Sequence, residues 1–237
     1  MQVRTQPSSG DPGSRDFDLP GVAPSRQKRS RETTLALLRA GAHMLRTRSL
    51  AEVSIEALCA EVGVTVGAFY SRFESKEAYF NALMALAARD GEQRLGDIRR
   101  PSPTTDLDKL CRIVVSGIIV WMRHHEGVLR AALQHDDTRP DQWTPFKALA
   151  KATTERATPL LLAAMGKGRT AARTRAIAFG LQVVLGTLVN AILNDPGPLS
   201  LRSKEMETRL ADCLLLLLQA EAGQPKSLAR SSVSKPP

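Results

Sequence analysis

The sequence predicts an all-α protein of about nine helices. Its 237 residues are 43% hydrophobic but only 4% aromatic, so the core must consist mainly of Leu, Ala, Val and Ile. That composition suits helix-on-helix packing better than strands built on aromatic and β-branched residues. Apolar residues recur at helical spacing along the chain, and segments rich in Pro and Gly, such as residues 195–198, separate the apolar stretches.

The first helix is expected over about residues 30–46, with Ser30 as its cap. Its apolar side chains fall at helical spacing and are expected to form one buried stripe, made of Leu35, Leu38, Ala42 and Leu45. Residues 26–48 also contain seven basic residues and one acidic residue. Such a cluster is either a solvated face or a surface that attracts the phosphates of a polyanion.

Two short helices joined by a glycine turn are expected next. Ser54 can cap the first of them, and Gly63 provides the left-handed residue that ends it. Thr65 can cap the second helix, in which Phe69 and Phe73 stand four residues apart and point the same way. The pattern is that of a helix-turn-helix, whose second helix enters the major groove of DNA.

The face opposite the two phenylalanines is small, polar and slightly basic. Gly67 permits close approach of DNA, and the hydroxyls of Tyr70 and Ser71 can reach phosphate or base edges. At the margin of this face, Arg72 can read guanine or hold the backbone, or instead pair with a neighbouring glutamate.

Val66 has two alternative roles at the start of the same helix. It can offer methyl groups to thymine, or it can pack as a staple against the helix start. The sequence leaves both roles open.

These residues resemble the TetR (tetracycline-repressor) family of bacterial transcriptional regulators. The resemblance extends over about residues 30–87 and is carried by five motifs: Ser54-Ile55, Gly63-Val64, Thr65-Val66-Gly67, Phe69-Tyr70-Ser71-Arg72-Phe73 and Ser75-Lys76-Glu77. It implies that Lys76 contacts phosphate. The expected DNA-binding residues are therefore Ser54, Thr65, Val66, Gly67, Tyr70, Ser71, Arg72 and Lys76. Val66 and Ser71-Arg72 depart from the common family pattern, so the resemblance implies no particular base preference.

Later helices are expected over residues 76–95, 105–124, 127–134, 141–165, 170–194 and 201–222. The proline-containing segment 99–103 follows the fourth helix and marks the natural boundary between domains. The expected organisation is a disordered arm at 1–25, a DNA-binding domain at 26–90, a ligand-binding and dimerisation domain at 91–222, and a disordered tail at 223–237.

The helices expected over 170–194 and 201–222 are apolar around more than one face. Such helices are buried on all sides, either in the core of a monomer or at the interface of a symmetric homodimer. Gly180 and Gly186 would let two backbones approach closely. The family resemblance implies pairing through these two final helices.

The resemblance also implies that the second domain binds an unidentified small-molecule effector. The side chains expected to line its cavity are Trp121, His124, Trp143, Phe146, Phe179 and Gln182. Each of them is alternatively an ordinary core or surface residue.

No pattern in the sequence indicates an enzyme, a metal site or a cofactor site. The histidines and the three cysteines lack ligand spacing, and no phosphate loop or nucleophile elbow is present. The apolar runs are expected to be too short to cross a bilayer, and the N-terminus lacks an apolar run, so a cytoplasmic protein is expected. The resulting hypothesis is a ligand-released homodimeric repressor of a palindromic operator. The alternative is a DNA-localised protein-interaction adaptor of the same fold.

Overall fold

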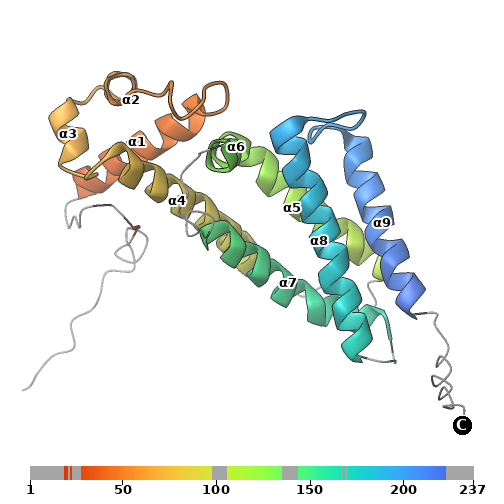
Figure 1. Ribbon diagram of the computed structural model, residues 1–237. Coiled ribbons are helices and arrows are strands. Elements are labelled where there is room, and N and C mark those ends of the chain that lie inside the picture. Colours follow the sequence, from red (N-terminus) through yellow and green to blue (C-terminus); the bar gives the residue numbers. More distant parts are fainter. Residues whose placement is uncertain are drawn as a thin grey trace, which may run out of the picture. The chain divides into compact units, whose positions relative to one another are not determined.

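The computed structural model describes residues 19–20, 22, 28–97, 106–134, 144–166, 168 and 170–222. These residues form nine helices (Figure 1): α1 Lys28–Met44, α2 Ile55–Val62, α3 Val66–Tyr70, α4 Lys76–Asp97, α5 Leu107–His124, α6 Glu126–Gln134, α7 Thr144–Ala164, α8 Thr170–Asn194 and α9 Lys204–Ala222. The predicted all-α class is confirmed, and most predicted helix ends lie within three residues of the observed ones.

The chain divides into two compact units, and neither is continuous in sequence. The first consists of Met1–Arg94 with His124–Leu149, and the second of Leu95–Arg123 with Ala150–Pro237. The helix α6 therefore belongs with the helix-turn-helix, because it packs against α1. The domain limits expected from the sequence, with a single cut near residue 90, stay a prediction.

An aromatic cluster forms the centre of the first unit. The rings of Phe69, Phe73 and Tyr79 have centroids 5.0 to 5.4 Å apart, and each side chain is at most 1% exposed. The Tyr79 hydroxyl donates a hydrogen bond to the carbonyl of Leu37, at 2.8 Å. Burial raises the pKa of this phenol well above its usual value. The cluster therefore joins α3 and α4 and is tied to α1.

The buried face of α1 differs from the predicted stripe. It consists of Thr34, Leu37, Leu38, Gly41 and Leu45, whereas Leu35 and Ala42 are only partly buried. The cause is Gly41: a β-carbon added there would lie 1.7 Å from the Tyr79 hydroxyl oxygen. The helix thus turns its glycine to the aromatic ring, which apolar periodicity alone does not predict.

Two contacts hold the start of α6 within the first unit. A β-carbon added at Gly127 would lie 2.4 Å from the Leu45 carbonyl oxygen, so α6 meets the end of α1 backbone to backbone. Beside it, His125 Nε2 lies 2.9 Å from Asp90 Oδ2 of α4, and Asp90 also pairs with Arg94 at 2.8 Å. Burial lowers the pKa of His125, against the opposing effect of Asp90.

In the second unit, α8 and α9 run side by side (Figure 1). The helix α9 occupies the space beside Gly180 of α8, since a β-carbon added at Gly180 would lie 2.6 Å from Leu214 Cδ1. The helix α5 is tied to α9 by the Arg112–Asp212 ion pair, at 2.9 Å. Arg123 Nε also donates to the Leu201 carbonyl, at 2.7 Å.

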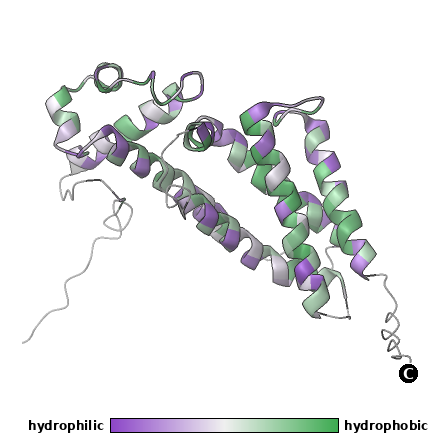
Figure 2. Ribbon diagram, in the orientation of Figure 1, coloured by the Kyte–Doolittle hydropathy of each residue, from purple (hydrophilic) through white to green (hydrophobic). Residues whose placement is uncertain are grey.

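The expectation that no apolar segment is long enough to cross a bilayer is wrong for α8. Its 25 residues include an 18-residue window of mean hydropathy 2.0, and within the described residues it is the one helix of sufficient length and hydropathy. The apolar character extends along most of the helix (Figure 2). The prediction counted as apolar only residues 181–193, the C-terminal half of this helix. A helix buried in a protein interface has the same composition.

Replacing Gly41 by alanine is expected to destabilise the protein by about 1–3 kcal/mol, because the new methyl group clashes with Tyr79. Gly117→Ala is the matched control: it lies within α5, nothing lies within 4 Å of the added β-carbon, and alanine should stabilise the helix by about 0.5–1 kcal/mol. Urea unfolding of both variants measures the difference. Equal stability of the two variants would contradict the packing described for Gly41.

Acidification is expected to weaken the first unit through His125. Its pKa is lower in the folded state, so this contribution is complete above about pH 6.5 and is lost as the pH falls below that value. The unfolding midpoint in urea should therefore fall between about pH 7.5 and 5.5. His125→Asn should flatten this dependence, whereas replacing the exposed His43 by Asn should not. Identical pH profiles for both variants would show that His125 is not responsible.

Candidate nucleic-acid interface

The helix-turn-helix is held in shape by local caps. Gly63 ends α2 with φ 72°, in the left-handed region that favours glycine. The Ser54 and Thr65 side-chain oxygens each accept a hydrogen bond from a backbone N–H three residues later, Ala57 and Ala68, at 3.1 Å. The predicted capping roles of Ser54, Gly63 and Thr65 are confirmed.

The exposed side of α3 brings together most of the residues predicted to contact DNA. Tyr70 is 53% exposed and Val66 is 37% exposed, so Val66 is not a buried staple. Thr65, Gly67 and Ser71 are exposed as well. Since Phe69 on the opposite side is fully buried, the helix presents this face to solvent.

No contact within the described part of the chain requires glycine at position 67. A β-carbon added there would meet only the Thr65 hydroxyl oxygen, at 3.8 Å, an ordinary contact distance. Glycine also weakens a helix relative to alanine. The missing side chain thus leaves open space on the outer face of α3 that the chain itself does not fill.

Arg72 does not extend outward from α3. Its guanidinium donates hydrogen bonds to the Ala68 carbonyl, to Ser71 Oγ at 3.1 Å and to Ser30 Oγ of α1 at 3.4 Å. This position favours support of the end of α3 over base reading, and it uses neither Glu74 nor Glu77 for these bonds.

Lys76 begins α4 beside the segment that leads into α2. Its ammonium group donates to the Ala51 carbonyl at 3.4 Å, and Ser75 caps the helix by accepting from the Ala78 N–H at 3.0 Å. Lys76 therefore lies close in space to the start of the helix-turn-helix. Exposed arginines of α1 and the following loop add positive charge to the same unit: Arg29, Arg39, Arg46 and Arg48.

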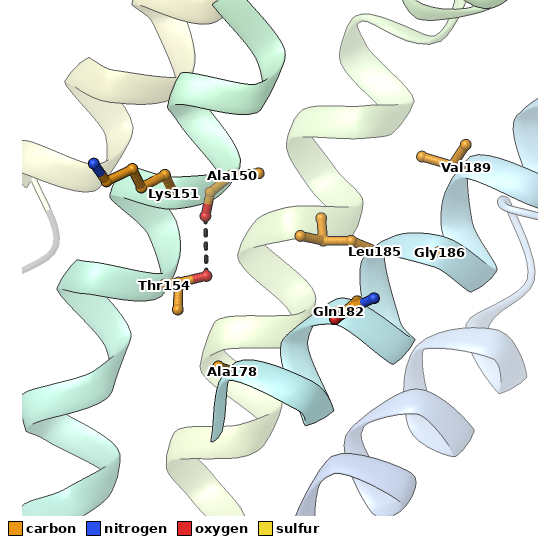
Figure 3. A pocket seen from close by; sticks show the side chains of 8 residues that line it. All are labelled: Ala150, Lys151, Thr154, Ala178, Gln182, Leu185, Gly186 and Val189. Carbon is orange, nitrogen blue, oxygen red and sulfur yellow. Dashed lines mark hydrogen bonds between the residues drawn. The ribbon is translucent and has the colours of Figure 1, made fainter. Parts of the chain in front are cut away.

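The residues predicted to line an effector cavity differ in their exposure. Trp121 and Phe146 are buried, His124 is exposed and Phe179 is 57% exposed, while Trp143 lies outside the described residues. Gln182 alone lines a groove of about 380 Å³ between α7 and α8 (Figure 3). The groove is lined by Ala150, Lys151, Thr154, Ala178, Gln182, Leu185, Gly186 and Val189.

The sequence prediction missed this groove because it searched for bulky side chains. The α8 wall instead carries non-aromatic residues at helical spacing, namely Ala178, Gln182, Leu185, Gly186 and Val189. Across it, the Thr154 hydroxyl is bonded to the Ala150 carbonyl of its own helix at 3.0 Å (Figure 3). Among the described residues, no group of three or more His, Cys, Asp or Glu side chains could hold a metal ion.

Comparison with known proteins places the helix-turn-helix in a family. Residues 37–83 match the family model for bacterial regulatory proteins of the tetR family. The HTH-type transcriptional regulator EthR of Mycobacterium tuberculosis is 27% identical over 97 residues, and its namesake in Mycobacterium bovis matches equally. These alignments cover 41% of this chain and 45% of the relatives' length.

Solved structures resemble the chain over most of its length. A tetR-family transcriptional regulator from Streptomyces coelicolor has a TM-score of 0.61 at 19% identity, covering 81% of this chain and 82% of that one. A transcriptional regulator from Cytophaga hutchinsonii has a TM-score of 0.58 at 14% identity, covering 83% and 97%. At these identities the likeness concerns the fold. Residues 37–83 thus match the helix-turn-helix of the tetR family, and the solved structures share the fold over most of the chain.

Proposed function

We propose that the chain is a sequence-specific DNA-binding transcriptional regulator, acting as a homodimeric repressor that leaves a palindromic operator when a small effector binds. The observation that carries this proposal is the exposed face of α3. Val66, Gly67, Tyr70 and Ser71 lie on a helix whose opposite side is fixed by buried Phe69. A slim helix with hydroxyls and methyl groups on its outer face fits the major groove.

Phosphate contacts would come from the ends of the helices. Ser54 and Thr65 lie at the N-termini of α2 and α3, where side-chain hydroxyls and free N–H groups can donate to phosphate. Lys76 supplies a positive charge, while the exposed arginines of α1 attract the duplex over a longer range. Arg72 acts in this proposal by supporting α3.

The two-fold partner would pack on α8 and α9. Phe179 of α8 and Leu216 of α9 are 57% and 65% exposed, large for apolar side chains. Gly186 has nothing within 4 Å of an added β-carbon, whereas Gly180 is filled by Leu214. Of the two glycines singled out in the sequence, Gly180 is thus already covered by its own chain, whereas Gly186 is open and lines the α7–α8 groove.

The effector would bind in the second unit and change which dimer geometry is populated. The α7–α8 groove is largely apolar with Lys151, Thr154 and Gln182 as polar groups, which suits a small amphipathic molecule. A ligand that prefers a dimer whose recognition helices no longer match grooves about 34–36 Å apart would release DNA. We include no catalysis, cofactor or metal in this proposal. The proposed location is the cytoplasm.

Gly67→Ala is expected to weaken operator binding at least ~10-fold, because a methyl group would occupy the space that DNA approaches. Its thermal stability should stay equal or rise, since alanine favours the helix and no internal clash results. Footprinting on the DNA upstream of the coding region measures the binding, and Gly117→Ala serves as the control. Unchanged binding by Gly67→Ala would mean that α3 does not closely approach DNA.

Phe179→Glu is expected to shift the dimer to monomer, because it buries a charge in the proposed interface. Replacement of the exposed Ile113 of α5 by Glu is the matched control, since α5 lies outside that interface. Analytical ultracentrifugation at micromolar concentration distinguishes them. A wild-type monomer, or equal behaviour of both variants, would refute pairing through α8 and α9.

A further inference from the structure

We propose that the short segment formed by Leu19, Pro20 and Val22 anchors the recognition helix, so that residues ahead of the first helix position α3 for DNA. The consequence for DNA rests on the proposed function, whereas the anchoring itself does not. The segment lies within residues that the sequence predicts to be a disordered arm. The backbone pair between Val22 and Phe73 joins the segment to the residues after α3, and the burial of Leu19 and a separate contact of Arg72 add to this support.

The need for an anchor follows from the length of α3. It has five residues, and helices of that length are not stable in isolation. Its N-terminal end is fixed by the Thr65 cap and the Gly63 turn. Its C-terminal end depends on contacts made by the residues that follow, Ser71 to Phe73.

The first two contacts come from one turn of the N-terminal segment. Leu19 is only 4% exposed, and its carbonyl accepts a hydrogen bond from the Val22 N–H at 3.2 Å. The backbone of Val22 forms an antiparallel β-bridge with that of Phe73. A buried leucine and a backbone pair thus fix the segment at the residue where the chain leaves α3.

The third contact reaches the same end of α3 from α1. The Arg72 guanidinium bonds to the Ala68 carbonyl inside α3 and to Ser30 Oγ. Its Nε is buried without a hydrogen-bond partner among the described residues. The end of α3 is therefore enclosed from the N-terminal side of the chain.

Phe73 explains why this enclosure affects the outer face of α3. Its ring packs on Phe69 and Tyr79, and its N–H donates to the Phe69 carbonyl at 3.0 Å. Any displacement of Phe73 would thus move the last turn of α3, which carries Tyr70 and Ser71. The anchor would set the direction of these two hydroxyls.

Hydrogen exchange of the full chain tests the anchor directly. Leu19→Ser is compared with Pro20→Ser, which changes the exposed neighbour, and with the milder Leu19→Ala in case the serine variant does not fold. The amides of residues 69–73, bonded to carbonyls within the turn and helix, should exchange ~10-fold or more faster in the Leu19 variants. Pro20→Ser and the amides of α8 should match the wild type.

Two exchange results would overturn the proposal. Unchanged exchange at 69–73 would show that the segment does not hold α3. Equal acceleration throughout α1, α2 and α4 would show that Leu19 merely stabilises the unit as a whole.

A binding measurement separates the anchor from the proposed function. The probe is a duplex selected from a random library by the wild-type protein, followed by fluorescence anisotropy. Leu19→Ala should bind it ~10-fold more weakly than Pro20→Ser. Equal affinities, despite faster exchange, would overturn the positioning role. If the wild type selects no sequence, the proposed function fails while the exchange result still decides the anchor.

Discussion

The burial of three aromatic rings is the constraint on which the first unit depends. A five-residue helix has too few hydrogen bonds to persist alone, so α3 exists because Phe69 and Phe73 pack on Tyr79. The Tyr79 hydroxyl in turn bonds to Leu37, and Gly41 leaves the room that the ring needs. With one side of α3 fixed so firmly, its other side is free to carry small and polar residues.

The glycines fall into two groups, according to whether other parts of the chain pack closely against them. Gly41, Gly127 and Gly180 lie where other parts of the chain approach too closely for a β-carbon. Gly67 and Gly186 lie where the chain itself leaves space. In the proposed function, Gly67 faces DNA and Gly186 faces the groove that would hold the effector.

Features that depend on neighbours in sequence were predictable, and those that depend on distant residues were not. Ser54 and Thr65 cap their helices because capping is a local matter. The buried face of α1 was predicted incorrectly because Gly41 packs against Tyr79, which lies far along the chain. Arg72 turns toward Ser30, 42 residues away, and Leu19 is buried within a segment whose composition predicts disorder. Which of the expected effector residues face a cavity also depends on helix packing, and among them Gln182 lines the α7–α8 groove.

In the proposed function, the outer face of α3 reads base pairs. The most direct test compares the sequences that wild type and Val66→Ala enrich from a random duplex library, because Val66 is exposed on that face. We expect a palindromic consensus for the wild type and a changed base preference at symmetry-related positions for the variant. An identical consensus for both proteins, or no enriched sequence at all, would contradict it.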